Sequence, residues 1–146
     1  MSGILSAISG APLSVRAGRD NSLTGIGGDT ADLLGNWQLP GGRSKQDQLA
    51  EWFNGAAFAQ NGIGTFGSTG IGWLRGPGTW NIDLAAAKNF KITESKRFEF
   101  RSSFYNLFNH ANLGNPDTTV LDSTFGKITS MSNSPRVIEF GMKFGF

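Results

Sequence analysis

Three stretches of the chain alternate apolar and polar residues with a period of two, and this alternation restricts the fold more than any other feature of the sequence. They are residues 79–90, 97–108 and 136–146, each 11 or 12 residues long. Successive side chains of a β-strand point to opposite faces, so each stretch predicts a strand with one apolar and one polar face. This length exceeds the ~5–6 residues of a typical soluble strand and suits a tilted membrane-crossing strand of ~9–11 residues. Residues 2–9 are a fourth candidate strand with a weaker pattern.

The alternation also predicts which side chains share a face. In a membrane-crossing barrel the apolar face meets lipid and the polar face lines the interior. The residues predicted to face the membrane are Trp80, Ile82, Leu84, Phe98, Phe100, Phe104, Ile138, Phe140 and Met142. The residues predicted to face the lumen are Asn81, Asp83, Arg97, Glu99, Arg101 and Lys143. Because the same alternation could line a protein core, a soluble β-sandwich remains an alternative.

Aromatic residues lie near both ends of two of these stretches. Trp80 and Phe90 bracket the first, and Phe98 and Phe108 bracket the second. Transmembrane barrels carry aromatic girdles at both membrane interfaces. The placement therefore favours the membrane interpretation over the sandwich.

The connections between the stretches differ greatly in length. Residues 91–96 are a short polar turn, whereas residues 10–78 and 109–135 are long. Outer-membrane barrels have short turns on the periplasmic side and long loops outside the cell. Following the strand directions puts both long connections on one side, so we expect them to be external and the chain to end in the periplasm.

The long first connection is rich in glycine, which leaves little room for long regular elements. One short helix is expected within it. Ser44, followed three residues later by Asp47, is an approximate N-terminal cap, and Leu49, Trp52 and Phe53 then fall on one helical face. Long external loops often carry recognition, so this connection is also the expected ligand-facing part.

Composition excludes several other classes of protein. Charged residues are 16% of the chain, against about 25% in a typical soluble domain. The formal net charge of +2 is too small to indicate nucleic-acid binding, and the absence of cysteine excludes disulfides, thiolate catalysis and cysteine-based zinc sites. No apolar run approaches the ~20 residues of a membrane helix, and the start lacks the pattern of a secretory signal peptide. We expect neither an enzyme nor a bound cofactor or metal.

Weaker motifs have plainer interpretations. Residues 62–67 have the glycine spacing of a dinucleotide-binding loop, but that fingerprint needs a strand before it and a helix after it, so a flexible loop is favoured. Asp20, Asn21 and Asp29 lack the spacing and closing glutamate of a calcium loop and are interpreted as loop side chains. His110, the only histidine, is a poor metal site by itself and is expected at a strand end near the outer interface.

Glu99 lies between Arg97 and Arg101 on one strand face. These residues could line the lumen for the passage of a charged substrate. A local ion-pair ladder that compensates the charges is the favoured interpretation.

The last twelve residues, 135–146, resemble the C-terminal assembly signal of bacterial outer-membrane barrels. That signal is a polar residue, any residue, glycine, two of any kind, an aromatic, any residue and a final aromatic, and Glu139, Gly141, Phe144 and Phe146 match it in register. The resemblance implies contact with the barrel assembly machinery. Gly141 is expected to remove a side chain where backbones crowd on the lumen face. An ordinary edge strand that happens to end in phenylalanine is the alternative.

A wider resemblance covers nearly the whole chain. Segments within 74–90, 97–110 and 125–136 are similar to the end of TonB-dependent transporters of the Oar-like group, and shorter segments in 18–22 and 52–58 also fit. The resemblance implies an energised receptor that moves a scarce or large solute across the outer membrane. Such transporters close a barrel of about 22 strands around a plug, so this chain would be a C-terminal fragment. The plug, the TonB-binding box, the carboxypeptidase-regulatory-like N-terminal domain and the signal peptide have no counterpart in it.

The expected fold is all-β: the last three or four antiparallel strands of a transmembrane β-barrel, with long external loops and one short loop helix. Met1 falls inside a strand, which suggests a truncated or mis-started reading frame. An open sheet with two unpaired edges would be poorly stabilised by itself. The expected partners are outer-membrane lipid, the barrel assembly machinery and an unidentified solute, with the remainder of the barrel and TonB as partners only in the full-length protein. A four-stranded subunit of an oligomeric surface barrel stays open as an alternative.

Overall fold

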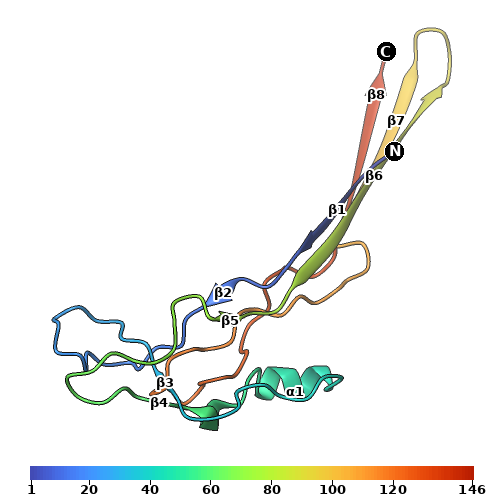
Figure 1. Cartoon of the computed structure of the whole chain (residues 1–146). Coiled ribbons are helices and arrows are strands. Elements are labelled where there is room, and N and C mark those ends of the chain that lie inside the picture. The colour runs from blue at the N-terminus through green and yellow to red at the C-terminus, as the bar shows by residue number, and fades with distance from the viewer. The chain divides into compact units, whose positions relative to one another are not determined.

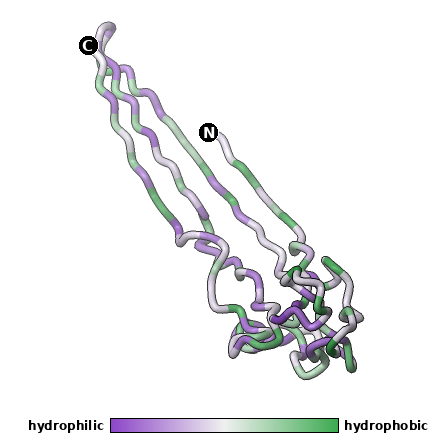
Figure 2. The backbone as a smooth tube through the Cα atoms, turned by 90° about the vertical axis from the view of Figure 1, so that its left-hand side faces the viewer, coloured by the Kyte–Doolittle hydropathy of each residue, from purple (hydrophilic) through white to green (hydrophobic).

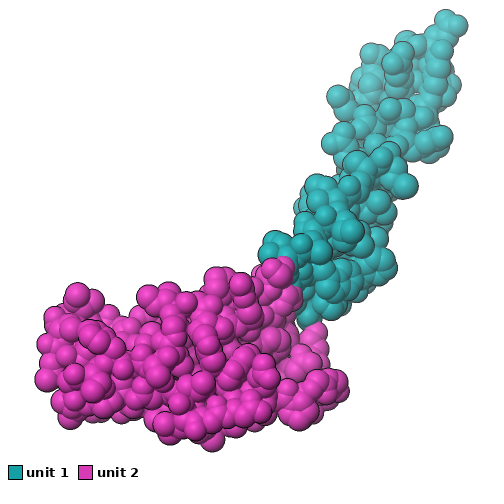
Figure 3. Space-filling view, in the orientation of Figure 1, with its two compact units in different colours: residues 1–8, 79–112, 133–146 teal, residues 9–78, 113–132 magenta.

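The computed structural model describes all residues from Met1 to Phe146. It divides into two compact units, coloured separately in Figure 3. The first, which we call the sheet unit, contains residues 1–8, 79–112 and 133–146. The second, which we call the loop unit, contains residues 9–78 and 113–132. Each unit is thus assembled from segments that are far apart in the sequence.

The sheet unit is built on four antiparallel strands in the order β1-β6-β7-β8 (Figure 1). Their bounds are Ser2–Ile8 for β1, Thr79–Lys91 for β6, Arg97–Tyr105 for β7 and Val137–Gly145 for β8. The strands form because their alternating residues, rich in aromatic and β-branched side chains, suit a pleated surface with two different faces. The all-β, antiparallel fold class and the short loop helix are confirmed. The sheet is open, with β1 and β8 at its two edges.

The predicted strand over 97–108 is too long at its C-terminal end. β7 stops at Tyr105 because Asn106 adopts a left-handed backbone with φ of 51°, as Asn109 does three residues later. Asparagine tolerates this conformation better than most residues do. At the other end of the sheet the turn after β6 is closed by a 3.0 Å hydrogen bond from the Ile92 amide to the Lys96 carbonyl.

Both long connections leave and return at the same end of the sheet. The register pairs Ile8 with Thr79 and Tyr105 with Val137, so each pair marks where a long connection begins and ends. The short turn after β6 and the C-terminus lie at the opposite end (Figure 1). That the long connections are outside the cell stays a prediction.

The loop unit packs around an aromatic and aliphatic core. Phe53 lies at its centre, with its ring 5.4 Å from that of Phe58 and 5.2 Å from that of Phe125, both in edge-to-face geometry. The other buried core residues are Val15, Ala31, Ala57 and Leu74. Short elements frame this core: β2 (Pro12–Leu13) pairs with β5 (Leu74–Arg75), β3 (Asp32–Leu33) pairs with β4 (Phe58–Ala59), and η1 (Gly55–Ala57) precedes β4. The glycine-rich connection is therefore a folded unit rather than an extended loop.

The predicted helix is present as α1 (Lys45–Ala50). The Ser44 hydroxyl caps it by accepting a hydrogen bond from the Asp47 amide, as the sequence indicates. The helix ends earlier than the apolar stripe predicts, because Glu51 is extended with φ of −157°. Trp52 and Phe53 therefore follow the helix instead of extending its face, and Phe53 enters the core. No helix in the structure has the length and apolar character needed to cross a membrane.

Candidate functional site

The strand register sorts the sheet into two chemically different faces. Residues directly opposite each other in an antiparallel pair share a face. Leu84, Phe104 and Ile138 form one such row, and the alternation of hydropathy along the strands is visible in Figure 2. All nine residues predicted to face the membrane fall on one face and all six predicted to face the lumen fall on the other. That the apolar face contacts lipid and the polar face lines the barrel interior stays a prediction.

Aromatic side chains gather at both ends of the apolar face. Phe90 and Phe98 have ring centroids 6.0 Å apart at the turn end, and Trp80 and Phe108 are 6.2 Å apart at the other end. Ten residues separate Trp80 from Phe90, or roughly 33 Å along a strand at ~3.3 Å per residue. With a tilt of about 40° this projects to roughly 25 Å, the height of the apolar band of outer-membrane barrels. The spacing of the aromatic clusters therefore suits a bilayer.

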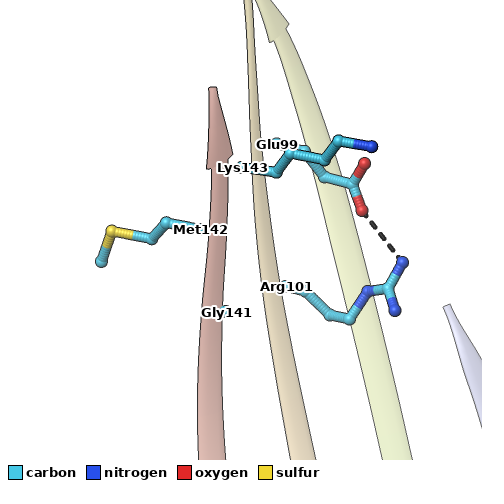
Figure 4. Close-up of a pocket in the computed structure, with 5 residues that line it drawn as sticks. All are labelled: Glu99, Arg101, Gly141, Met142 and Lys143. Atoms are coloured by element: carbon cyan, nitrogen blue, oxygen red, sulfur yellow. Dashed lines mark hydrogen bonds and ion pairs between the residues drawn. The ribbon is translucent and has the colours of Figure 1, made fainter. Parts of the chain in front are cut away.

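One ion pair lies on the polar face. Arg101 Nη2 is 3.0 Å from Glu99 Oε1, with the two side chains 65% and 29% exposed (Figure 4). Exposed pairs of this kind contribute about 0–1 kcal/mol. The ion pair does not extend to Arg97, so the predicted ladder is shorter than the charge pattern suggests.

Glycines of β8 leave two hollows beside this ion pair. The register places Gly141 opposite Arg101 and Gly145 opposite Arg97, with Lys143 between the two glycines and opposite Glu99. The hollows are about 240 Å³ and 330 Å³. They are floored by Gly141 and Gly145 respectively, because glycine adds no side chain to this face. Figure 4 shows the side chain of Met142 projecting away from the charged residues, so only its backbone belongs to this face.

The prediction that Gly141 lies where backbones crowd is wrong. A Cβ built on Gly141 would lie 3.9 Å from Arg101 Cβ, which is ordinary van der Waals contact. Backbones do not crowd at this position. The glycine instead leaves open space beside the Arg101 side chain.

Two of the predicted lumen-facing residues fix the end of β7. Asp83 Oδ1 accepts hydrogen bonds from the Asn106 amide at 2.9 Å and from Asn81 Nδ2 at 2.8 Å. The Asn106 side chain is buried. It accepts from the His110 amide and donates to the carbonyls of His110 and Ser134. Asn81 and Asp83 are thus engaged in positioning the chain where the strand stops, whereas Arg97 and Lys143, nearer the turn end, form no ion pair.

A second asparagine continues the hydrogen bonding of β6 beyond the end of β7. Asn112 Oδ1 accepts from the Trp80 amide and Asn112 Nδ2 donates to the Trp80 carbonyl, so the side chain pairs with the strand as a neighbouring backbone would. Asn133 Oδ1 in turn accepts from the Asn112 amide. The ring of His110 lies 4.2 Å from that of Trp80, at the end of the strand. The sequence interpretation missed this cluster, and the repeated asparagines after Tyr105 were the signal.

Polar side chains of the loop unit serve its own turns. Asp29 accepts from the Ser22 amide and hydroxyl and from Asn61 Nδ2, and the hydrogen bonds from Ser22 and Asn61 hold the pKa of its carboxyl below the usual range. Asp20 accepts from the amides of two following residues. No cluster of three His, Cys, Asp or Glu side chains is present. The glycine-rich segment 62–67 is a turn closed by Thr65, not a strand-to-helix junction.

Comparison with known proteins gives one match. Residues 1–139 match the family described as outer membrane beta barrel domain, and this range covers the loop unit and every strand except residues 140–145, the greater part of β8. No curated protein matches the chain, and no solved structure does. The match agrees with the open antiparallel sheet and its two faces, and it places the chain in the bacterial outer membrane. The chain belongs to the outer membrane beta barrel domain family.

Proposed function

We propose that the chain supplies wall strands and an outer domain to a TonB-dependent receptor that imports a solute across the outer membrane. The observation that carries this proposal is the four-stranded sheet with one apolar face, one charged face and both long connections at one end. The similarity of segments 74–90 and 97–110 to the Oar-like group supports the energised type of transport.

The exposure of the apolar face favours a lipid neighbour over a protein core. Phe140 and Met142 are 65% and 73% exposed, and Ile138 and Phe144 are also exposed. No other element of the sheet unit covers these side chains. Soluble proteins seldom leave so large an apolar surface open to water. A β-sandwich would need a second sheet on this face.

The open edges require further strands. Unpaired amides and carbonyls along β1 and β8 are not tolerated in a bilayer. We propose that the remainder of a larger barrel pairs with them and that the barrel assembly machinery first engages β8 through Phe144 and Phe146. A ring made of several copies of this chain is a second way to close the sheet into a barrel. The four strands in each chain make this alternative worth testing. Crosslinking in detergent separates the two, because a ring gives a defined oligomer of this chain alone.

In this proposal the loop unit contacts the solute. Exposed Ile26, Phe66 and Ile71 line a shallow hollow of about 470 Å³ on it. We propose no catalytic step and no cofactor. His110, the single histidine, has its ring against Trp80 and its backbone bonded to Asn106.

The first test is localisation. The chain is expressed behind a secretory signal in three forms: intact, with Phe146 deleted, and with the exposed loop residue Phe66 replaced by alanine as a control. We expect the intact and Phe66→Ala forms in the outer-membrane fraction and loss of the Phe146-deleted form from it. If all three stay soluble in the periplasm, the apolar face packs against protein and the barrel proposal fails.

The second test concerns energy coupling. Cells with and without the gene are compared for uptake of a panel of labelled solutes, with and without a protonophore. We expect at least one solute whose uptake needs both the gene and an energised inner membrane. Gene-dependent uptake that persists with the protonophore would indicate a passive pore instead.

A further inference from the structure

The hollow over Gly145 has an unusual set of side chains around it. Its lining is Asn89 of β6, Arg97 and Glu99 of β7, and Lys143 and Gly145 of β8. Three adjacent strands therefore contribute to it on the polar face. Glycine opposite Arg97 keeps the floor open, since any other residue at 145 would extend a side chain into the space.

The cations of this hollow have no partner within the chain. Neither Arg97 nor Lys143 makes an ion pair or a side-chain hydrogen bond, and the Asn89 amide donates none. The only carboxylate in the lining, Glu99, is already held by Arg101 at 3.0 Å. Lys91, opposite Arg97 in the register, adds a further positive charge on the same face. The Gly145 hollow is thus rich in free donors.

The neighbouring hollow over Gly141 provides a contrast within the same sheet. It shares Glu99 and Lys143 with the Gly145 hollow, but its arginine, Arg101, is paired with Glu99. The two hollows differ mainly in whether the arginine is satisfied. Only the Gly145 hollow combines an unpaired guanidinium, an unpaired ammonium and a free amide.

These donors match an oxyanion. A guanidinium can donate two parallel hydrogen bonds to a carboxylate or phosphate, and an ammonium adds a compact positive charge. Within a barrel, where bulk water is reduced, such charges interact more strongly than on an open surface. Arg97 and Lys143 are both exposed on this face, so an anion can reach their side chains.

We propose that the Gly145 hollow binds a carboxylate or phosphate group of the transported solute, held by Arg97 and Lys143 with Asn89 as a third donor. This inference rests on the proposed transport function and assigns the solute to the anionic class. Glu99 lines the hollow, but its pairing with Arg101 compensates its charge, so that the carboxylate competes less for Arg97.

The test uses the full chain refolded in nonionic detergent micelles, with inorganic phosphate and then acetate as probes. The side-chain N–H signal of Arg97 is followed by NMR at constant ionic strength, and circular dichroism checks the strand content of each variant. We expect a saturable shift with at least one probe. We expect at least tenfold weaker binding in Arg97→Gln and in Lys143→Gln.

Two further variants separate a built site from a diffuse positive field. Gly145→Val keeps every charge but fills the hollow, and we expect it to weaken anion binding at least tenfold. A Cβ at residue 145 would make a single contact, at 4.0 Å from the Arg97 carbonyl oxygen, so the strand accommodates the substitution. Lys91→Gln removes one charge outside the hollow and should change binding less than threefold. Unsaturable shifts shared by all arginines, or equal losses in Lys91→Gln and Arg97→Gln, would overturn the site. This binding assay does not depend on transport. The anion site can therefore be disproved while the uptake experiment supports the transport function, and the site can be supported while the uptake experiment fails.

Discussion

At the scale of single residues, the end of β7 depends on Asn106. It combines a left-handed backbone with a buried amide that makes three hydrogen bonds to the chain after the strand. Each such bond contributes about 0.5–1.5 kcal/mol net, and a left-handed alanine costs about 1–2 kcal/mol. We expect Asn106→Ala to lower the free energy of unfolding by about 2.5–6.5 kcal/mol, measured by urea titration in lipid vesicles with strand content as the signal.

Asn106→Gly divides this effect into its two parts. Glycine adopts the left-handed backbone freely but makes none of the side-chain bonds, so it should be more stable than the alanine variant by about 1–2 kcal/mol. Asn109, also left-handed, makes only one side-chain bond, to the Arg136 amide, and Asn109→Gly should cost less than Asn106→Gly. Equal stabilities for Asn106→Ala and Asn106→Gly would mean that backbone conformation does not limit this site.

At the scale of the strand, the two faces of β7 differ in their expected surroundings, and adjacent serines make the comparison direct. Ser102 lies on the apolar face in the row with Ala86 and Phe140, near the middle of the apolar band, whereas Ser103 lies on the polar face opposite Glu139. An arginine at the bilayer midplane on the lipid face costs about 2–4 kcal/mol. We therefore expect Ser102→Arg to destabilise the folded protein in vesicles by that amount and Ser103→Arg to change its stability by less than about 1 kcal/mol.

Both variants are measured in the same vesicles and also in detergent, where the midplane penalty should shrink for Ser102→Arg. Equal losses of unfolding free energy for Ser102→Arg and Ser103→Arg would mean that the surroundings of the two faces are equally polar. A larger cost for Ser103→Arg would reverse the assignment of lipid and lumen.

The elements show which features the sequence could and could not predict. Period-two alternation located β6, β7 and β8, because the side-chain direction of a strand depends only on residue parity. It could not locate the end of β7, where hydrogen bonds from Asn106 to distant residues outweigh the continuing pattern. It also could not place Phe53, whose burial depends on packing against Phe58 and against Phe125, which lies far along the chain. Likewise, the hollow over Gly145 required the register between strands, which a single sequence does not contain.

At the scale of the whole molecule, the topology relates the ends of the sheet to the sides of the membrane. Both long connections open from the end marked by Ile8 and Thr79, and the β6–β7 turn lies at the other end. Outer-membrane barrels keep short turns in the periplasm. Membership of the outer membrane beta barrel domain family therefore predicts that the loop unit lies outside the cell and that the β6–β7 turn lies in the periplasm.

The absence of cysteine from this chain allows that orientation to be tested with single introduced thiols. Ile63 of the loop unit is 80% exposed, and Ser95 in the turn is also exposed, so each can carry a cysteine without disturbing a core. On intact cells that display the protein, a membrane-impermeant maleimide should label Ile63→Cys within minutes and leave Ser95→Cys unlabelled until the outer membrane is permeabilised. Labelling of Ser95→Cys alone in intact cells would mean that the barrel has the opposite orientation, with the turn outside the cell. Labelling of neither residue before permeabilisation would mean that the sheet does not cross the outer membrane, and the loop unit could then no longer be the part that first meets the solute.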